Sequence, residues 1–179
     1  MMRAFVSVDI TDDLIGDAIM RVQRNSGLGG AIRRESMHFT LMFLGKVDTS
    51  KTADIVRALK DVDFEAFDIQ CRGLGEFTFS KGKIIWVGVD RHGGMMLKEL
   101  ASKVAKTLMP LGFVDRKRFL PHATIFRVKN KTGDTANVLK RFENIEFGIQ
   151  RVNSIRLKSS VLSSSGSTYK DIVTIGAKR

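Results

Sequence analysis

The sequence predicts an α+β fold in which mainly antiparallel sheets carry helices on the outside and enclose a central cleft. Two observations lead to this prediction. Strand-like and helix-like patterns alternate along the chain, and the order strand, helix, strand, helix, strand occurs twice. Short segments of the first half also recur in the second half at offsets of about 80 residues, which indicates an internal duplication.

The first elements follow from side-chain periodicity. Residues 3–10 alternate in polarity and predict a strand. Thr11 is the expected N-cap of a helix whose apolar positions recur every three or four residues. The glycine-rich residues 27–30 end this helix before the strand that contains His38. A second helix is expected over about 50–61, with its apolar side chains on one face.

The middle of the chain predicts a hairpin and a long helix. Strands are expected near 67–79 and 83–90, joined by a tight turn at 80–82. A helix over about 94–109 is indicated by a single apolar stripe that stops before Pro110. This stripe is typical of core packing.

The last third repeats the pattern. The strand with His122 follows Pro121, which is tolerated at the start of a strand. A helix over about 133–143 comes next. Strands over 146–162 and 168–177 flank a serine-rich turn and close the chain.

The duplication divides a single domain into pseudo-repeats over about 1–80 and 82–162, followed by a C-terminal hairpin strand. The repeats align through short matches, among them 5–9 with 86–90 and 67–70 with 147–150. His38 and His122 lie 84 residues apart in equivalent positions. We therefore expect a pseudo-twofold arrangement in which equivalent residues face each other across one groove.

Composition restricts the class of protein. The 179 residues are enough for one compact domain, which we expect to be a monomer. The chain has no apolar run of membrane-spanning length and no signal-peptide layout, so we expect no membrane association and a cytoplasmic location. Cys71 is the single cysteine and cannot form an internal disulfide. The net charge of +11 favours a polyanionic partner, above all nucleic acid, with solubility as the simpler alternative.

Two of the three histidines begin the same pattern, His38-Phe39-Thr40-Leu41 and His122-Ala123-Thr124-Ile125. On a strand, the histidine and threonine share one face and the apolar pair points into the core. Two such strands facing each other offer an acid–base pair, because one imidazole can be protonated while the other is neutral near pH 7. The threonine hydroxyls can bind phosphate oxygens. This equipment suits the cleavage of a phosphodiester, although ordinary structural histidines are the alternative.

Basic residues accompany both patterns. Arg34 and Arg118 each stand four residues before their histidine, and Arg127 follows His122 by five. Strict alternation places Arg127 on the face opposite His122, so a role beside it requires a bulge or a strand end. One cysteine and three scattered histidines offer no zinc-ligand spacing, and no phosphate-binding glycine loop is present, so we expect neither metal nor cofactor.

Residues 38–45 and 118–127 resemble the paired H-x-T-x signatures of the two-histidine phosphoesterases. Within that group the chain is similar to the bacterial and archaeal RNA 2′,3′-cyclic phosphodiesterases, also called 2′-5′ RNA ligases. The resemblance extends from the opening strand to the closing hairpin at Tyr169. It implies the bilobal two-histidine phosphoesterase fold, metal-independent hydrolysis of RNA 2′,3′-cyclic phosphate to a 2′-phosphate, and ATP-independent joining of tRNA halves through a 2′-5′ linkage.

In this reaction one histidine protonates O3′ and the other activates water. We expect His38 to be the proton donor and His122 the acceptor, with Thr40 and Thr124 on the phosphate. Arg34, Arg118 and Arg127 are candidates for RNA contact. Two other functions stay open: hydrolysis of a small cyclic nucleotide or of an ADP-ribose cyclic phosphate, and a non-catalytic module that binds RNA ends. Steep salt dependence would favour RNA over a mononucleotide.

Overall fold

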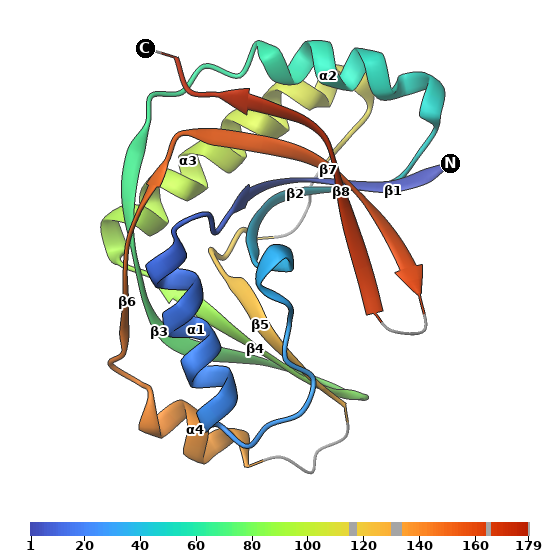
Figure 1. Ribbon diagram of the computed structural model, residues 1–179. Coiled ribbons are helices and arrows are strands. Elements are labelled where there is room, and N and C mark those ends of the chain that lie inside the picture. Colours follow the sequence, from blue (N-terminus) through green and yellow to red (C-terminus); the bar gives the residue numbers. More distant parts are fainter. Residues whose placement is uncertain (115–117, 130–133, 164–165, 179) are drawn as a thin grey trace.

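The computed structural model describes residues 1–114, 118–129, 134–163 and 166–178. Within them, the strands are β1 (Met2–Asp9), β2 (His38–Val47), β3 (Phe67–Phe79), β4 (Gly82–Val89), β5 (Ala123–Lys129), β6 (Glu146–Val152), β7 (Ser154–Ser163) and β8 (Gly166–Gly176). These eight strands form one sheet in the order β6-β3-β4-β5-β2-β1-β7-β8 (Figure 1), and every pairing between neighbouring strands is antiparallel.

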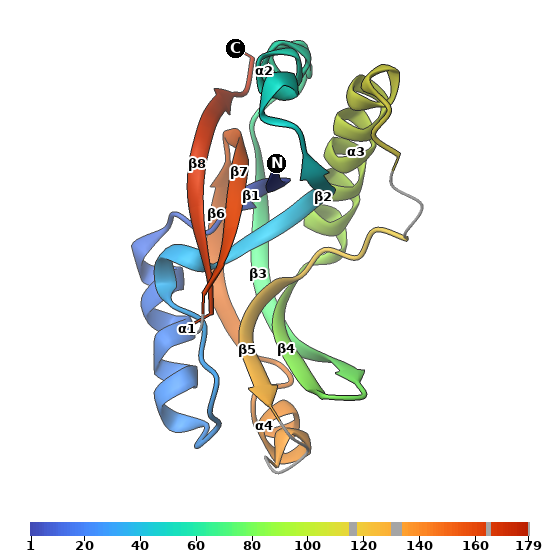
Figure 2. The same cartoon turned by 90° about the vertical axis from the view of Figure 1, so that its right-hand side faces the viewer.

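The described residues also form four α-helices: α1 (Asp13–Asn25), α2 (Thr52–Lys60), α3 (Arg91–Leu108) and α4 (Thr135–Arg141). Figure 2 shows α1 and α3 on opposite sides of the strands. Helix α1 contacts β5 and β6, whereas α3 contacts β2, β3 and α2. The predicted α+β class with a mainly antiparallel sheet is confirmed. None of the described helices is both long and apolar enough to cross a membrane.

The sheet consists of two four-stranded halves that meet at β2 and β5. These two strands pair through Phe39 and Ala123 alone. The order is symmetric about this junction, with β1 and β4 next to the centre, β7 and β3 beyond them, and β8 and β6 at the edges. A sheet joined so narrowly at its middle leaves space between the halves for a cavity. The division of the sequence into two repeats remains a prediction.

Strand order does not follow the predicted equivalence of 67–70 with 147–150. These segments belong to β3 and β6, which are direct neighbours, with Ile69 opposite Gln150. The predicted strand 146–162 is also two strands, because Asn153 separates β6 from β7 and the two lie in opposite halves. The strand-like pattern of side chains continues through both strands, so it could not reveal that the chain passes from one half of the sheet to the other at Asn153.

Two helix starts differ from prediction for a local reason. Asp12, and not Thr11, caps α1, since its carboxylate accepts a hydrogen bond from the Ile15 amide at 3.0 Å. Asp90 caps α3 in the same way through the amides of His92 and Gly93, so this helix starts three residues earlier than 94.

Candidate active site

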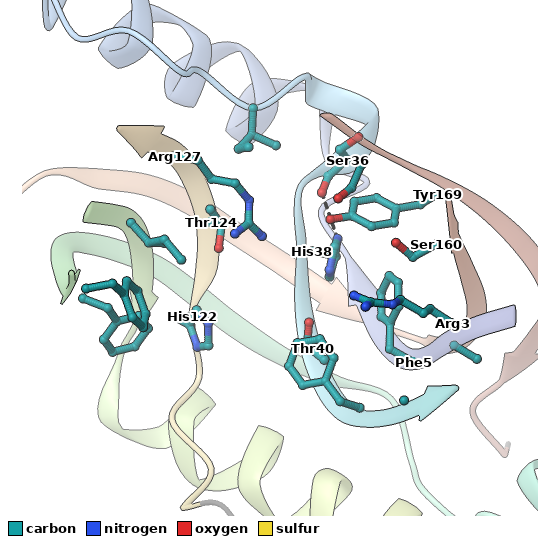
Figure 3. A pocket seen from close by; sticks show the side chains of 18 of the residues that line it. Arg3, Phe5, Ser36, His38, Thr40, His122, Thr124, Arg127, Ser160 and Tyr169 are labelled. Carbon is teal, nitrogen blue, oxygen red and sulfur yellow. Dashed lines mark hydrogen bonds between the residues drawn. The ribbon is translucent and has the colours of Figure 1, made fainter. Parts of the chain in front are cut away.

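A cavity of about 630 Å³ lies between the two halves of the sheet. Figure 3 shows His38 and Thr40 on β2 at one side, opposite His122, Thr124 and Arg127 at the other. The structure therefore brings together five of the seven residues that the sequence analysis named. This volume falls within the range of sites that bind small ligands.

The apolar residues of both motifs anchor the histidines and threonines. Phe39, Ala123 and Ile125 have no exposed surface, and Leu41 is 3% exposed. Because successive side chains alternate across a strand, this burial turns His38 and Thr40 to the cavity together. His122 directly precedes β5, and Thr124 follows it on the same face.

A β-bulge returns Arg127 to the cavity. Thr124 pairs with Trp86, but Phe126 pairs with Ile85, so Ile125 is an extra residue in β5. Ile125 and Phe126 are then both buried, and the alternation is shifted by one position. The bulge thus places Arg127 on the same face as His122, as a contact between Arg127 and RNA requires.

Strand β2 contains the equivalent bulge. Thr40 pairs with Ser7 and Met42 with Val6, which leaves Leu41 as the extra residue. Phe43 is consequently 64% exposed and lines the cavity in the position that Arg127 has in the other half. Strict alternation would point Phe43 into the core, so its position in the sequence gives no sign that it lines the cavity.

Both imidazoles are oriented by a backbone carbonyl. The Nδ1 atom of His38 lies 2.8 Å from the carbonyl oxygen of Ser36, and that of His122 lies 2.7 Å from that of Leu120. A carbonyl can only accept, so we assign the hydrogen to Nδ1 in each ring. The Nε2 atoms are then the ones available to accept or donate a proton.

The two histidines have different surroundings. The His38 ring stacks on Phe5 at a centroid distance of 4.9 Å and meets the edge of Tyr169 at 5.1 Å. His122 meets Phe77 edge-on at 4.9 Å and Trp86 at 6.2 Å. Aromatic packing thus restrains each ring in addition to its hydrogen bond.

Burial lowers the pKa of His38 to about 4. The Asp9 carboxylate and the Ser36 carbonyl act against this effect, whereas the charges of Lys158 and Arg127 add to it. Without a bound anion, His38 is therefore neutral at pH 7, which is the form of a proton acceptor. The donor role expected for His38 requires a negative charge close to the ring.

A cluster of paired charges lies behind His38. Lys158, whose side chain is 4% exposed, bonds to Asp9 and, at 3.0 Å, to Asp171. Arg156 bonds to the same two carboxylates at 3.1 and 2.8 Å. The equivalent of Asp9 in the other half, Asp90, caps α3 instead. In the described part of the chain, only the half with His38 combines the histidine with an ion cluster around a buried lysine.

The remaining predicted arginines do not line the cavity. The Arg34 guanidinium binds the carboxylates of Asp13 at 2.7 Å and Asp17 at 2.8 Å, on α1. Arg118 is exposed and absent from the cavity wall. Its neighbours Arg116 and Lys117 lie outside the described residues. Of the three arginines, Arg127 alone has the placement for contact with a ligand in the cavity.

Comparison with known proteins gives one consistent result. The family model for the AKAP7 2'5' RNA ligase-like domain matches residues 5–176. A protein of Archaeoglobus fulgidus named RNA 2',3'-cyclic phosphodiesterase is 37% identical over 96% of this chain and 98% of its own length. A protein of Aquifex aeolicus with the same name is 32% identical over 94% of both chains.

Solved structures share the fold. The apo structure of E. coli LigT superposes with a TM-score of 0.79 at 17% identity, covering 99% of this chain and 98% of LigT. TT0787 of Thermus thermophilus gives a TM-score of 0.78 at 20% identity, covering 98% and 97%. At such low identity the superpositions establish the architecture alone.

Proposed function

Because this chain belongs to the family of AKAP7 2'5' RNA ligase-like domains, we propose that it hydrolyses RNA 2′,3′-cyclic phosphate ends to 2′-phosphate ends. Relatives that carry the name RNA 2',3'-cyclic phosphodiesterase match it almost from end to end. The observation that carries the proposal is the placement of two His-x-Thr pairs, from the two central strands, in the wall of one cavity.

The reaction follows from the side chains that face the phosphorus atom. Nε2 of His122 accepts a proton from water as the water oxygen bonds to phosphorus. The bond from phosphorus to O3′ breaks, and Nε2 of His38 donates a proton to O3′. The product carries a 2′-phosphate and a free 3′-hydroxyl. Each proton transfer is expected to contribute about 10²–10⁴-fold to the rate.

The other cavity residues stabilise the charge on the phosphate. The hydroxyls of Thr40 and Thr124 donate to the non-bridging oxygens, where negative charge grows in the transition state. The Arg127 guanidinium adds a positive charge on the same side as His122. The Asp9 carboxylate supports the protonated form of His38, as the donor role requires.

We expect the same displacement, with the 5′-hydroxyl of a second RNA in place of water, to join RNA halves: the 5′ oxygen bonds to phosphorus, the bond from phosphorus to O3′ breaks, and a 2′-5′ linkage forms without ATP. tRNA fragments as partners, a monomeric state and a cytoplasmic location remain predictions. No described group of three or more His, Cys, Asp or Glu side chains is arranged to hold a metal ion. Metal independence is tested directly in EDTA.

The test uses a short RNA with a terminal 2′,3′-cyclic phosphate, in EDTA. The proteins are the wild type, His38→Ala, His122→Ala, and His92→Ala as a matched histidine control outside the cavity. We expect the first two variants to lose at least about 10²-fold in kcat, the control to keep its activity, and the product to be the 2′-phosphate. Undiminished turnover in either cavity variant, or a 3′-phosphate product, would refute the mechanism.

A further inference from the structure

Four cavity residues form a row across the half of the sheet that contains His38. Arg3 on β1 pairs with Lys46 on β2 and, on its other side, with Ser160 on β7. Ser160 in turn pairs with Tyr169 on β8. Directly paired residues share a face of the sheet, and all four line the cavity.

This row places two positive charges side by side. Like charges opposite each other on neighbouring strands repel and lower stability. Among the described residues, no carboxylate forms an ion pair with Arg3 or Lys46, and the described wall of the cavity has no acidic side chain. The hydroxyls of Ser160 and Tyr169 complete a set of hydrogen-bond donors that suits an anion.

The row adjoins the catalytic histidine but is separate from the scissile phosphate. Tyr169 contacts the His38 ring directly, and Figure 3 shows the Arg3 side chain extending from β1 in the direction of His38. Along β1, the backbone at Arg3 is about 13 Å from that at Ser7, the partner of Thr40, for four residues of strand. A single phosphate on Thr40 and Thr124 therefore leaves this row free for another.

We propose that Arg3 and Lys46, with Ser160, bind the phosphodiester one step upstream of the cyclic phosphate. The inference rests on the proposed function, in which His38 protonates O3′ and the terminal ribose therefore lies on the His38 side. The 5′ oxygen of that ribose leads to the upstream phosphate, which reaches the row. The site thereby selects RNA ends over cyclic mononucleotides, which have one phosphorus atom.

The opposite half of the cavity has a different chemistry. Phe77, Phe79 and Ile84 line it from β3 and β4. These side chains offer apolar surface for a base. The positive charge that lines this half, Arg127 on β5, lies with His122 and Thr124 at the scissile phosphate. We therefore expect the RNA strand to leave the catalytic centre through the half of the cavity that contains His38 and the row.

The experiment compares three substrates: a nucleoside 2′,3′-cyclic phosphate, a dinucleotide that ends in the same group, and that dinucleotide with an uncharged methylphosphonate as its internal linkage. The variants are Arg3→Gln and Lys46→Gln. The control is Lys170→Gln, which removes an exposed charge beside Tyr169 that does not line the cavity. The readout is the ratio of kcat/KM for the dinucleotide to that for the mononucleotide.

In the wild type, we expect the methylphosphonate to lower this ratio by about tenfold, because a charge-assisted contact is lost. Arg3→Gln is expected to lower the ratio for the ordinary dinucleotide by a similar factor. With the methylphosphonate dinucleotide, Arg3→Gln should lower the ratio little further, since the substitution and the uncharged linkage remove the same contact. Lys46→Gln should act in the same direction, and the control should keep the wild-type ratio.

Equal ratios in the wild type and Arg3→Gln, or full additivity of the two losses, would overturn the second site while leaving the phosphodiesterase intact. Failure of the wild type to cleave any of the three substrates would instead contradict the proposed function. Binding of the 2′-phosphate product dinucleotide, with and without the methylphosphonate, is then measured by calorimetry. The site is supported if the wild type and Lys170→Gln bind the phosphodiester product more tightly than the methylphosphonate product, and Arg3→Gln binds both equally. Equal affinities for the two products in the wild type would reject the site.

Discussion

The protonation of His38 gives the most direct test of the donor role. Without an anion, burial lowers the pKa of His38 to about 4, so only about one molecule in 10³ is protonated at pH 7. A bound phosphate brings a negative charge close to the ring. At about 4 Å and an effective dielectric constant of about 20, a unit charge contributes about 4 kcal/mol, which raises the pKa by about three pH units. The bound enzyme should then have a His38 pKa near that of an ordinary imidazole.

The measurement is a titration of the imidazole carbon and nitrogen resonances in histidine-labelled protein, with and without a nucleoside 2′-monophosphate. Three histidines give three signals, and His38→Gln identifies the one that matters. We expect the His38 signal to titrate far below pH 6 in free protein and close to neutrality when the ligand is bound. The signal of His92, which lies outside the cavity, serves as the internal control.

Two results would refute this reasoning. A pKa close to 6.5 in the free protein would mean that burial does not control His38. A pKa that stays below about 5 in the complex would deny His38 the proton at neutral pH and would reverse the roles of the two histidines. A substrate with sulfur in place of O3′ would then identify the donor, because a thiolate leaves without protonation and restores only the variant that lacks the donor.

Three further predictions concern pH, the phosphate contacts and the core. Between about pH 6.5 and pH 4, His38 binds a proton in the unfolded chain but not in the folded protein, because folding lowers its pKa from 6.5 to about 4. The free energy of unfolding therefore falls as the pH falls through this range, by up to about 3 kcal/mol. In urea unfolding, His38→Gln should lose less stability on acidification than the wild type. Thr124→Val should lower kcat by about 10²-fold and Thr124→Ser should restore most of it, whereas equal rates in both would deny the hydroxyl its role. Phe126→Ala removes a side chain with no exposed surface and should cost about 3–5 kcal/mol in unfolding free energy; a loss below 1 kcal/mol would show that the bulge does not depend on this packing.

Much of the site could be predicted because it depends on local patterns. A histidine and a threonine two positions apart share a face of any strand, and the apolar residues between them fix which face is buried. The duplication then predicts where the second copy belongs. For these reasons His38, Thr40, His122 and Thr124 could be predicted to share one groove, and all four line the cavity.

Other features depend on contacts between distant segments. Neither bulge has a local signal, because Leu41 and Ile125 are ordinary strand residues and become extra only in pairing with β1 and β4. Arg34 was predicted to contact RNA because of its spacing from His38, but its guanidinium binds two carboxylates of α1, which the spacing does not reveal. The low pKa of His38 likewise depends on burial against Phe5 and Tyr169, which lie far away in the chain.

Periodicity and residue type are local properties, and they were enough to predict the α+β class, the two strands that carry the motifs and the chemistry of their side chains. The tertiary structure alone decided that β3 and β6 are neighbours, that Arg127 returns to the cavity, and that Arg3 and Lys46 stand side by side. Register and strand order arise from pairing between segments that are distant in the chain, and no short window of residues contains that information.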